Sequence, residues 1–357
     1  MAHARLTSVL LAALAVAATA QGAPLAPAMP GPATAARLAQ MHGEAATQSA
    51  ACEGCHADIA AEHRGSLHRR SQEDPAYQRA FAAEPLPFCQ RCHAPEADPD
   101  RPVPPQLAAL GTGCVTCHVT GDGGILAAPR DRSSPRRDAP HAVVRDARFG
   151  AEGACVGCHD FAFPPGVARR RTEPMQATIA EHRSSAWASF SCAECHMERA
   201  KGGHRSHGFA ASRSPAKIRA AATVSAARIG PGVLRVSLVA GDVGHAFPTG
   251  DLFRRLTVSA EVEGDDHAVI ARAERHLARH FGEARLGLAG ARTQIRDDRL
   301  GVGGIERAVD LALGPEAEGL PIAWRVAYER VEHPLSSDGE QALIEGSIMV
   351  AEGIAPP

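Results

Sequence analysis

Five short clusters of cysteine and histidine carry most of the chemistry that this 357-residue chain could perform. Each reads Cys-x-x-Cys-His, and together they use all ten cysteines. Two cysteines three residues apart lie on one side of a helical turn, where they can form thioethers to the two vinyl groups of a haem. The histidine that follows can then bind the iron. The cysteines are Cys52, Cys55, Cys89, Cys92, Cys114, Cys117, Cys155, Cys158, Cys192 and Cys195, and the histidines are His56, His93, His118, His159 and His196.

Other uses of paired cysteines explain this pattern less well. Zinc sites employ Cys-x-x-Cys pairs but do not need a histidine directly after each pair. A redox dithiol needs one such pair, and a disulfide framework does not account for five identical spacings. The pattern therefore predicts five covalently bound c-type haems.

The start of the chain is typical of an export signal. A short segment with one positive charge precedes the apolar run Leu6–Ala18, and Ala18-Thr19-Ala20 resembles a cleavage site. Residues 1–20 are therefore predicted to be a signal peptide, with an uncleaved anchor as the alternative. No later stretch has the ~18 apolar residues of a transmembrane helix. The expected location is the periplasm, with the cell surface as the alternative.

The elements that must hold the haems are expected to be short. Residues 21–40 are Ala/Pro-rich and predict a flexible leader, and residues 41–215 predict a pentahaem domain of short helical turns and loops. Aromatic residues form only 4% of the chain, too few for an ordinary aromatic-rich core. Porphyrin faces are therefore expected to supply much of the buried apolar surface.

Residues 216–357 contain no cysteine and have a different texture. Apolar residues alternate with polar ones, which predicts strands. The expected strands are 234–238, 256–262, 309–313 and 324–328, with 218–229, 268–273 and 341–350 as further candidates. About seven strands predict an antiparallel, sandwich-like domain, so the fold class is α+β.

Residues around the first motif resemble a known family. Cys55-His56 is followed by Glu62, Ser66 and His68. This order is similar to that of multihaem c-type cytochromes related to the tetrahaem electron acceptor of hydroxylamine oxidoreductase. That family has Glu-Trp-x-x-Ser-x-His, whereas His63 stands here in place of Trp. Three further segments fit the same family, namely 175–181, 195–207 and 244–250. The resemblance covers residues 41–250 and implies bis-histidine haems and electron transfer, although related families include reductases.

A second set of histidines could supply the sixth iron ligands that the resemblance implies. The candidates are His68, His42, His141, His204, His207 and His245, of which His204 and His207 compete for one haem. His68 is expected to bind a haem other than that of His56, because twelve residues of helix span about 18 Å. His63 and His182 could either bind iron or pack against a porphyrin. Met175 and Met197 are better explained by packing.

Other charged or metal-binding patterns are weaker. His276 and His280 could hold a divalent metal if they lie on a helix, although a solvated face is the favoured alternative. The clusters 136–137 and 169–171 are arginines that could pair with haem propionates or remain exposed. The net charge of −2 gives no electrostatic reason to expect a nucleic-acid partner.

The sequence thus predicts an exported pentahaem electron-transfer protein with redox protein partners, soluble or membrane-bound. One alternative is a multihaem oxidoreductase that acts on a small nitrogen or sulfur compound at one five-coordinate haem. A second alternative is an extracytoplasmic scaffold in which the haems are structural.

Overall fold

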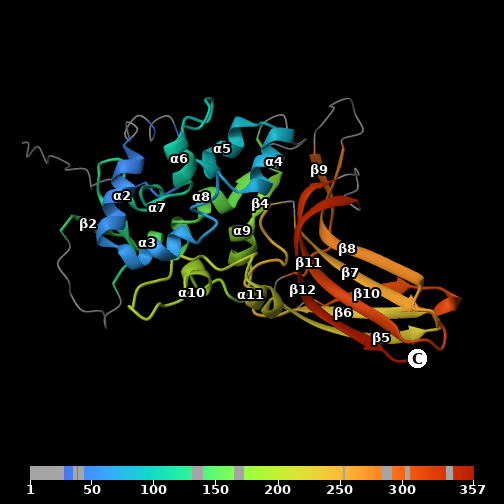
Figure 1. The fold of residues 1–357 in the computed structure, drawn as a ribbon. Coiled ribbons are helices and arrows are strands. Elements are labelled where there is room, and N and C mark those ends of the chain that lie inside the picture. The colour runs from blue at the N-terminus through green and yellow to red at the C-terminus, as the bar shows by residue number, and fades with distance from the viewer. Residues whose placement is uncertain are drawn as a thin grey trace, which may run out of the picture.

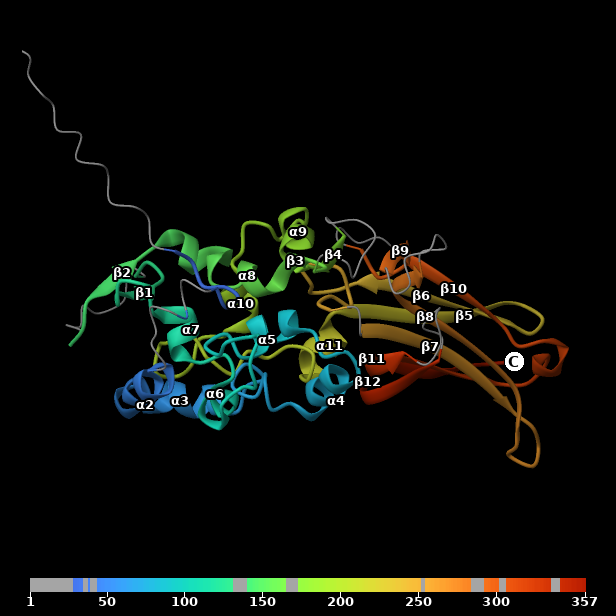
Figure 2. The ribbon, with the colours of Figure 1, turned by 90° about the horizontal axis from the view of Figure 1, so that it is seen from above.

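The computed structural model describes residues 28–34, 38, 44–130, 140–164, 173–251, 254–283, 292–301, 306–334 and 341–357. Short helices and loops form the N-terminal part, and long strands form the C-terminal part. The two parts lie end to end (Figure 1, and from above in Figure 2). No helix in the described ranges is long and apolar enough to cross a membrane.

Every Cys-x-x-Cys-His unit lies on or at the end of a short helix, as the sequence predicts. The first motif closes α2, and the other four close α5, α7, α8 and α10. The helices are α2 (Ala45–Cys55), α3 (Ala57–Arg64), α4 (Pro75–Ala83), α5 (Pro87–His93), α6 (Pro105–Leu110), α7 (Cys114–His118), α8 (Val156–His159), α9 (Thr178–Arg183), α10 (Cys192–His196) and α11 (Pro215–Ala220). A π-helical turn, η1 (Phe149–Gly153), and a 3₁₀ turn, η2 (Pro315–Ala317), are added to these.

Two small strand pairs lie among the helices. β1 (Ile125–Ala127) pairs with β2 (Val143–Arg145), and β3 (Asp160–Ala162) pairs with β4 (Pro174–Ala177). The second pair directly follows the fourth motif and leads into α9, so it fixes the distance between them.

The C-terminal part consists of two antiparallel sheets. One has the order β10-β6-β5 and the other β12-β11-β7-β8-β9. Val236 lies opposite Val309 in the first, and Val258 lies opposite Val326 in the second. The strands are β5 (Ala222–Gly230), β6 (Val233–Ala240), β7 (Arg254–Glu263), β8 (Val269–Glu283), β9 (Arg292–Asp297), β10 (Arg307–Ala312), β11 (Ile322–Pro334) and β12 (Ala342–Ala355).

The two parts differ in the size of their buried apolar core. One cluster of 22 buried residues joins both sheets, with Leu234 and Val258 fully buried at its centre. The main cluster among the helices contains six buried residues, and three of these are alanines. The helical part therefore lacks an apolar core of ordinary size in the described ranges.

Several sequence expectations need correction. Residue Ile218 lies in α11 rather than in a strand, because Ser214 caps that helix and Pro215 begins it. The strand β9 was not expected. His276 and His280 lie in β8, where four residues span about 13 Å, so a shared metal ion is excluded. Both side chains are buried rather than solvated, and they contact Thr257 and Asp298.

The described part of the leader lies against the helical part. Ala33 is buried, and its N–H donates to the Arg91 carbonyl at 2.9 Å. A Cβ built on Gly157 would lie 2.6 Å from the Gly31 Cα atom. Residues 28–34 thus contact the second and fourth motifs.

Candidate functional site

Four of the five motif histidines face a second histidine at nearly the same distance. The ring centres are 6.4 Å apart for His56 and His141, 6.1 Å for His159 and His68, 6.2 Å for His118 and His207, and 6.2 Å for His196 and His245. Two imidazoles that bind one metal ion through bonds of about 2.0 Å place their ring centres about 6 Å apart. Each pair therefore leaves the space that one iron and its porphyrin plane require.

Backbone contacts orient several of these rings for metal binding. The Nδ1–H of His118 donates to the Leu126 carbonyl at 2.7 Å, and that of His196 donates to the Ala210 carbonyl at 3.0 Å. The rings that face them are oriented in the same way. His207 donates from Nδ1 to the Arg205 carbonyl, and His245 donates from Nδ1 to the Ala246 carbonyl. A ring whose Nδ1 carries the proton presents Nε2 as the free ligand atom.

Burial favours the neutral form of five of the paired imidazoles. It lowers the pKa of His68 to about 3 and that of His207 to about 4. Burial also lowers the pKa of His118, His159 and His245. The neutral ring is the form that binds a metal, so these side chains are ready ligands at neutral pH.

The partners come from distant parts of the chain. His68 follows the first motif but faces His159 of the fourth, not His56. Conversely, His141 precedes the fourth motif and faces His56 of the first. The first and fourth motifs thus exchange their flanking histidines, and ligation itself stays a prediction.

Two other candidate histidines use their Nε2 atoms elsewhere. His204 Nε2 lies 3.1 Å from a carboxylate oxygen of Glu62, and His63 Nε2 donates to the Thr112 carbonyl at 2.9 Å. Of the competing pair, the structure therefore brings His207 to a motif histidine and leaves His204 aside. His182 lies against the loop of Gly244, with its Cδ2 3.2 Å from a Cβ built there.

The fifth motif histidine, His93, has different surroundings. Its Nδ1–H donates to the Ser71 carbonyl at 2.7 Å, and its ring stacks on Tyr77 with centres 3.8 Å apart. Burial raises the pKa of Tyr77, whose hydroxyl is buried and has no hydrogen-bond partner among the described residues. No ring among the described histidines faces His93 as in the other four pairs. The remaining candidate, His42, lies outside the described residues.

Thiols from different motifs touch one another. A hydrogen bond from Cys158 lowers the pKa of Cys92, and contact with Cys155 lowers the pKa of Cys192 to about 7. The fourth motif therefore lies between the second and the fifth. All ten cysteines are free of disulfide bonds, so each can form a thioether.

The other residues that the sequence suggests as ligands or propionate partners take no part in these histidine pairs. The Met175 carbonyl accepts a hydrogen bond from Arg279 at 2.8 Å, and the Met197 carbonyl lies 3.4 Å from Arg205. Both arginine clusters, 136–137 and 169–171, lie outside the described residues. The carboxylate of Glu181 was not anticipated from the sequence, and it contacts the loop that carries His245.

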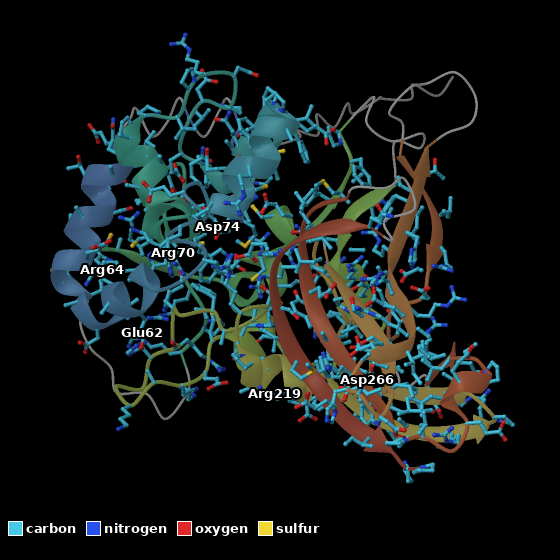
Figure 3. The ribbon with its side chains drawn as sticks, turned by 45° about the vertical axis from the view of Figure 1, so that its right-hand side comes forward. Glu62, Arg64, Arg70, Asp74, Arg219 and Asp266 are labelled. Carbon is cyan, nitrogen blue, oxygen red and sulfur yellow. The ribbon has the colours of Figure 1, made fainter. Side chains whose placement is uncertain are left out.

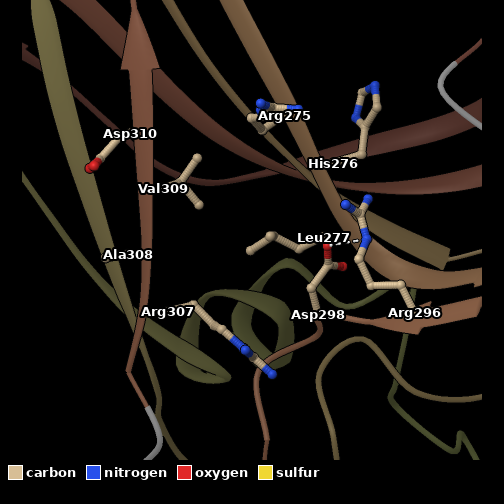
Figure 4. Close-up of a pocket in the computed structure, with 9 residues that line it drawn as sticks. All are labelled: Arg275, His276, Leu277, Arg296, Asp298, Arg307, Ala308, Val309 and Asp310. Carbon is tan, nitrogen blue, oxygen red and sulfur yellow. Dashed lines mark ion pairs between the residues drawn. The ribbon is translucent and has the colours of Figure 1, made fainter.

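A separate pocket of about 440 Å³ lies between the two sheets (Figure 4). Its lining combines basic and acidic side chains, and the ion pair of Arg296 with Asp298 at 3.1 Å crosses one side of it. No residue of a haem motif lines the pocket, so it belongs to the sheets alone.

Comparison with known proteins gives one informative likeness. No family model and no curated protein matches the chain. The fold is similar to the crystal structure of a penta-heme cytochrome c552 from Thermochromatium tepidum, with a TM-score of 0.61 and 18% sequence identity. The match covers 86% of this chain and 97% of that one. The chain thus shares its fold with a penta-haem cytochrome c across both its helical and its β-rich parts.

Proposed function

We propose that this protein is an exported pentahaem c-type cytochrome that passes electrons between redox protein partners, soluble or membrane-bound. The observation that carries the proposal is the set of four histidine pairs with ring centres 6.1–6.4 Å apart. Four such pairs give four irons two strong ligands each, which is the coordination of a transfer haem rather than a catalytic one. The likeness in fold to a penta-haem cytochrome supports the same conclusion.

The chain's own residues have separable roles in this proposal. The ten cysteines hold the porphyrin edges, the five motif histidines bind iron on one side, and His68, His141, His207 and His245 bind on the other. When bound, haem supplies one-electron redox chemistry. The protein supplies spacing, because the thiol contacts bring the second, fourth and fifth motifs together.

The sandwich-like β domain is proposed to brace the haem array. His245 reaches from it toward His196, and ion pairs join the two parts elsewhere. Arg213 contacts Asp74 at 2.9 Å and Glu345 at 3.1 Å, and Arg79 binds Glu332 at 2.7 Å. These contacts fix the domain where it can hold a sixth ligand in place.

A second candidate function rests on His93. The haem of this motif either takes His42 as its sixth ligand or remains open. No ring among the described histidines faces His93, and an open sixth position there would suit a reductase or oxidase of a small nitrogen or sulfur compound.

Electron paramagnetic resonance of the oxidised protein tests both candidates. Low-spin ferric signals from all five haems support the electron-transfer protein. A high-spin signal from one haem, together with cyanide binding, supports the second candidate at His93. Several high-spin haems would contradict both, because four pairs are expected to be six-coordinate.

The angles between paired rings predict a finer spectral pattern. The rings of His196 and His245 are nearly parallel, at 11°, whereas those of His68 and His159 are nearly perpendicular, at 80°. Parallel imidazoles split the iron d orbitals strongly and give a rhombic low-spin signal. Perpendicular imidazoles leave two of these orbitals nearly degenerate, which gives a highly anisotropic signal.

We therefore expect both signal types in one spectrum. Replacing His245 with alanine should remove a rhombic signal and spare the highly anisotropic one. Loss of the anisotropic signal in that variant would contradict the pairing.

A further inference from the structure

A six-residue pattern occurs twice in the helical part. Ala-Glu-His-Arg-x-Ser occupies residues 61–66 and again residues 180–185. The first copy ends α3 and the second ends α9. Both copies close with the same backbone turn, in which Gly65 N–H donates to the Glu62 carbonyl and Ser184 N–H donates to the Glu181 carbonyl. The two copies therefore share one local conformation.

In the first copy, the glutamate binds the segment that carries His207. One oxygen of Glu62 accepts the backbone N–H of His207 at 2.9 Å, and the other lies 3.1 Å from His204 Nε2. The N–H of His207 holds the pKa of Glu62 below its ordinary value, so the carboxylate is ionised. The ring of His207 in turn faces His118. Glu62 comes from α3, far from this segment in sequence (Figure 3).

In the second copy, the glutamate binds the loop that carries His245. One oxygen of Glu181 accepts the N–H of Ala246 at 3.2 Å and the hydroxyl of Thr249 at 2.7 Å. Its other oxygen accepts from the buried guanidinium of Arg299 at 2.7 Å. The same guanidinium donates to the Pro248 carbonyl at 3.0 Å. The loop is thereby held at three points around His245.

The arginines of the two copies also make similar ion pairs, and these lie away from the histidine pairs. Arg64 contacts Glu53 at 2.8 Å, and Arg183 contacts Glu152. Both arginine side chains are more than half exposed, at 52% and 59%. Glutamate and arginine in each copy thus have different partners, which allows their effects to be separated.

We propose that Glu62 and Glu181 are equivalent positioning residues, each of which holds the backbone beside the sixth ligand of a haem. Glu62 positions His207 opposite His118, and Glu181 positions His245 opposite His196. The inference rests on the proposed function, since it takes His207 and His245 as axial ligands. A carboxylate that accepts an N–H at this place opposes the outward swing of the loop and keeps the imidazole on the iron.

The test uses the haem-loaded protein with Glu62→Gln and Glu181→Gln. Glutamine keeps the shape of the side chain but loses the charge and one acceptor. Each variant should raise the rate of cyanide binding at one haem by about 10- to 100-fold, the range expected for the loss of one charged hydrogen bond. E181Q should alter only the rhombic signal of the His196 haem, and E62Q only the signal of the His118 haem.

Matched controls are Arg64→Gln and Arg183→Gln, which change the same two copies without touching either loop. They should leave the spectra and the cyanide rates unchanged. If Glu181→Gln does not mature, Thr249→Val removes one bond to the same carboxylate and should shift the same signal less.

Two outcomes overturn different statements. If the glutamine variants match the arginine controls in spectrum and cyanide rate, the positioning role is wrong while the proposed function stands. If His207→Ala and His245→Ala also leave every haem low-spin, the axial pairing within the proposed function is wrong.

Discussion

Replacement of His68 by alanine should convert one haem from low spin to high spin and leave the others near their original spectra. The ring of His68 lies 6.1 Å from that of His159, so the substitution is expected to remove the sixth ligand of the haem of the fourth motif. The variant should bind carbon monoxide when reduced and cyanide when oxidised. Because these two rings are nearly perpendicular, the highly anisotropic signal should disappear.

His63→Ala is the matched control for this experiment. His63 lies five residues earlier, at the end of α3, but its Nε2 donates to the Thr112 carbonyl. The His63→Ala variant should therefore lose the contact with the Thr112 carbonyl without changing the spin state of any haem. If the His68 variant keeps every haem low-spin and refuses carbon monoxide, His68 is not a ligand.

Protein made without haem should fold only in its C-terminal part. Folding must offset the conformational entropy that each ordered residue loses, and burial of apolar surface is the main favourable contribution. The six-residue cluster of the helical part cannot offset that cost over residues 44–215, whereas 22 buried residues support the two sheets. Porphyrin faces are expected to complete the first part.

Limited proteolysis and thermal unfolding of haem-free protein measure this difference. A resistant fragment that begins near residue 216 should survive, and it should melt in one transition. A haem-free chain whose residues 44–215 also resist protease and melt cooperatively would contradict the prediction.

Local patterns predicted the short helices at the five Cys-x-x-Cys-His units and most strands, because both depend on short spacings. The units from Cys52 to His196 lie at short helices as expected, and the alternation at 234–238 and 256–262 marks β6 and β7. The sequence gives no alternating pattern for the strand β9, because this strand lies at a sheet edge. Its Ile295 is 66% exposed, so its residues show no buried face.

Tertiary contacts determine which histidines lie together and whether a segment forms a helix or a strand, and sequence spacing alone does not show these contacts. His204 and His207 are three residues apart in one loop, and both contact Glu62, more than 140 residues earlier in the chain, but only His207 faces a motif histidine. The helical spacing of His276 and His280 was overridden by the pairing of β8 with β7 and β9. Histidine pairs between remote segments likewise have no signal in a single sequence.

The exchange of histidines between distant motifs has a consequence for biogenesis. If the chain is exported from its N-terminus, His56 emerges 85 residues before His141, and His118 emerges 89 residues before His207. His196 must wait for His245, which belongs to the loop that Glu181 and Arg299 secure. Each of these irons would stay open to water and oxidants until a later segment arrives, whereas His159 already has His68 behind it. Among the four pairs, the fourth centre is thus the one whose sixth ligand emerges before its motif, and closure of the fifth awaits the β domain.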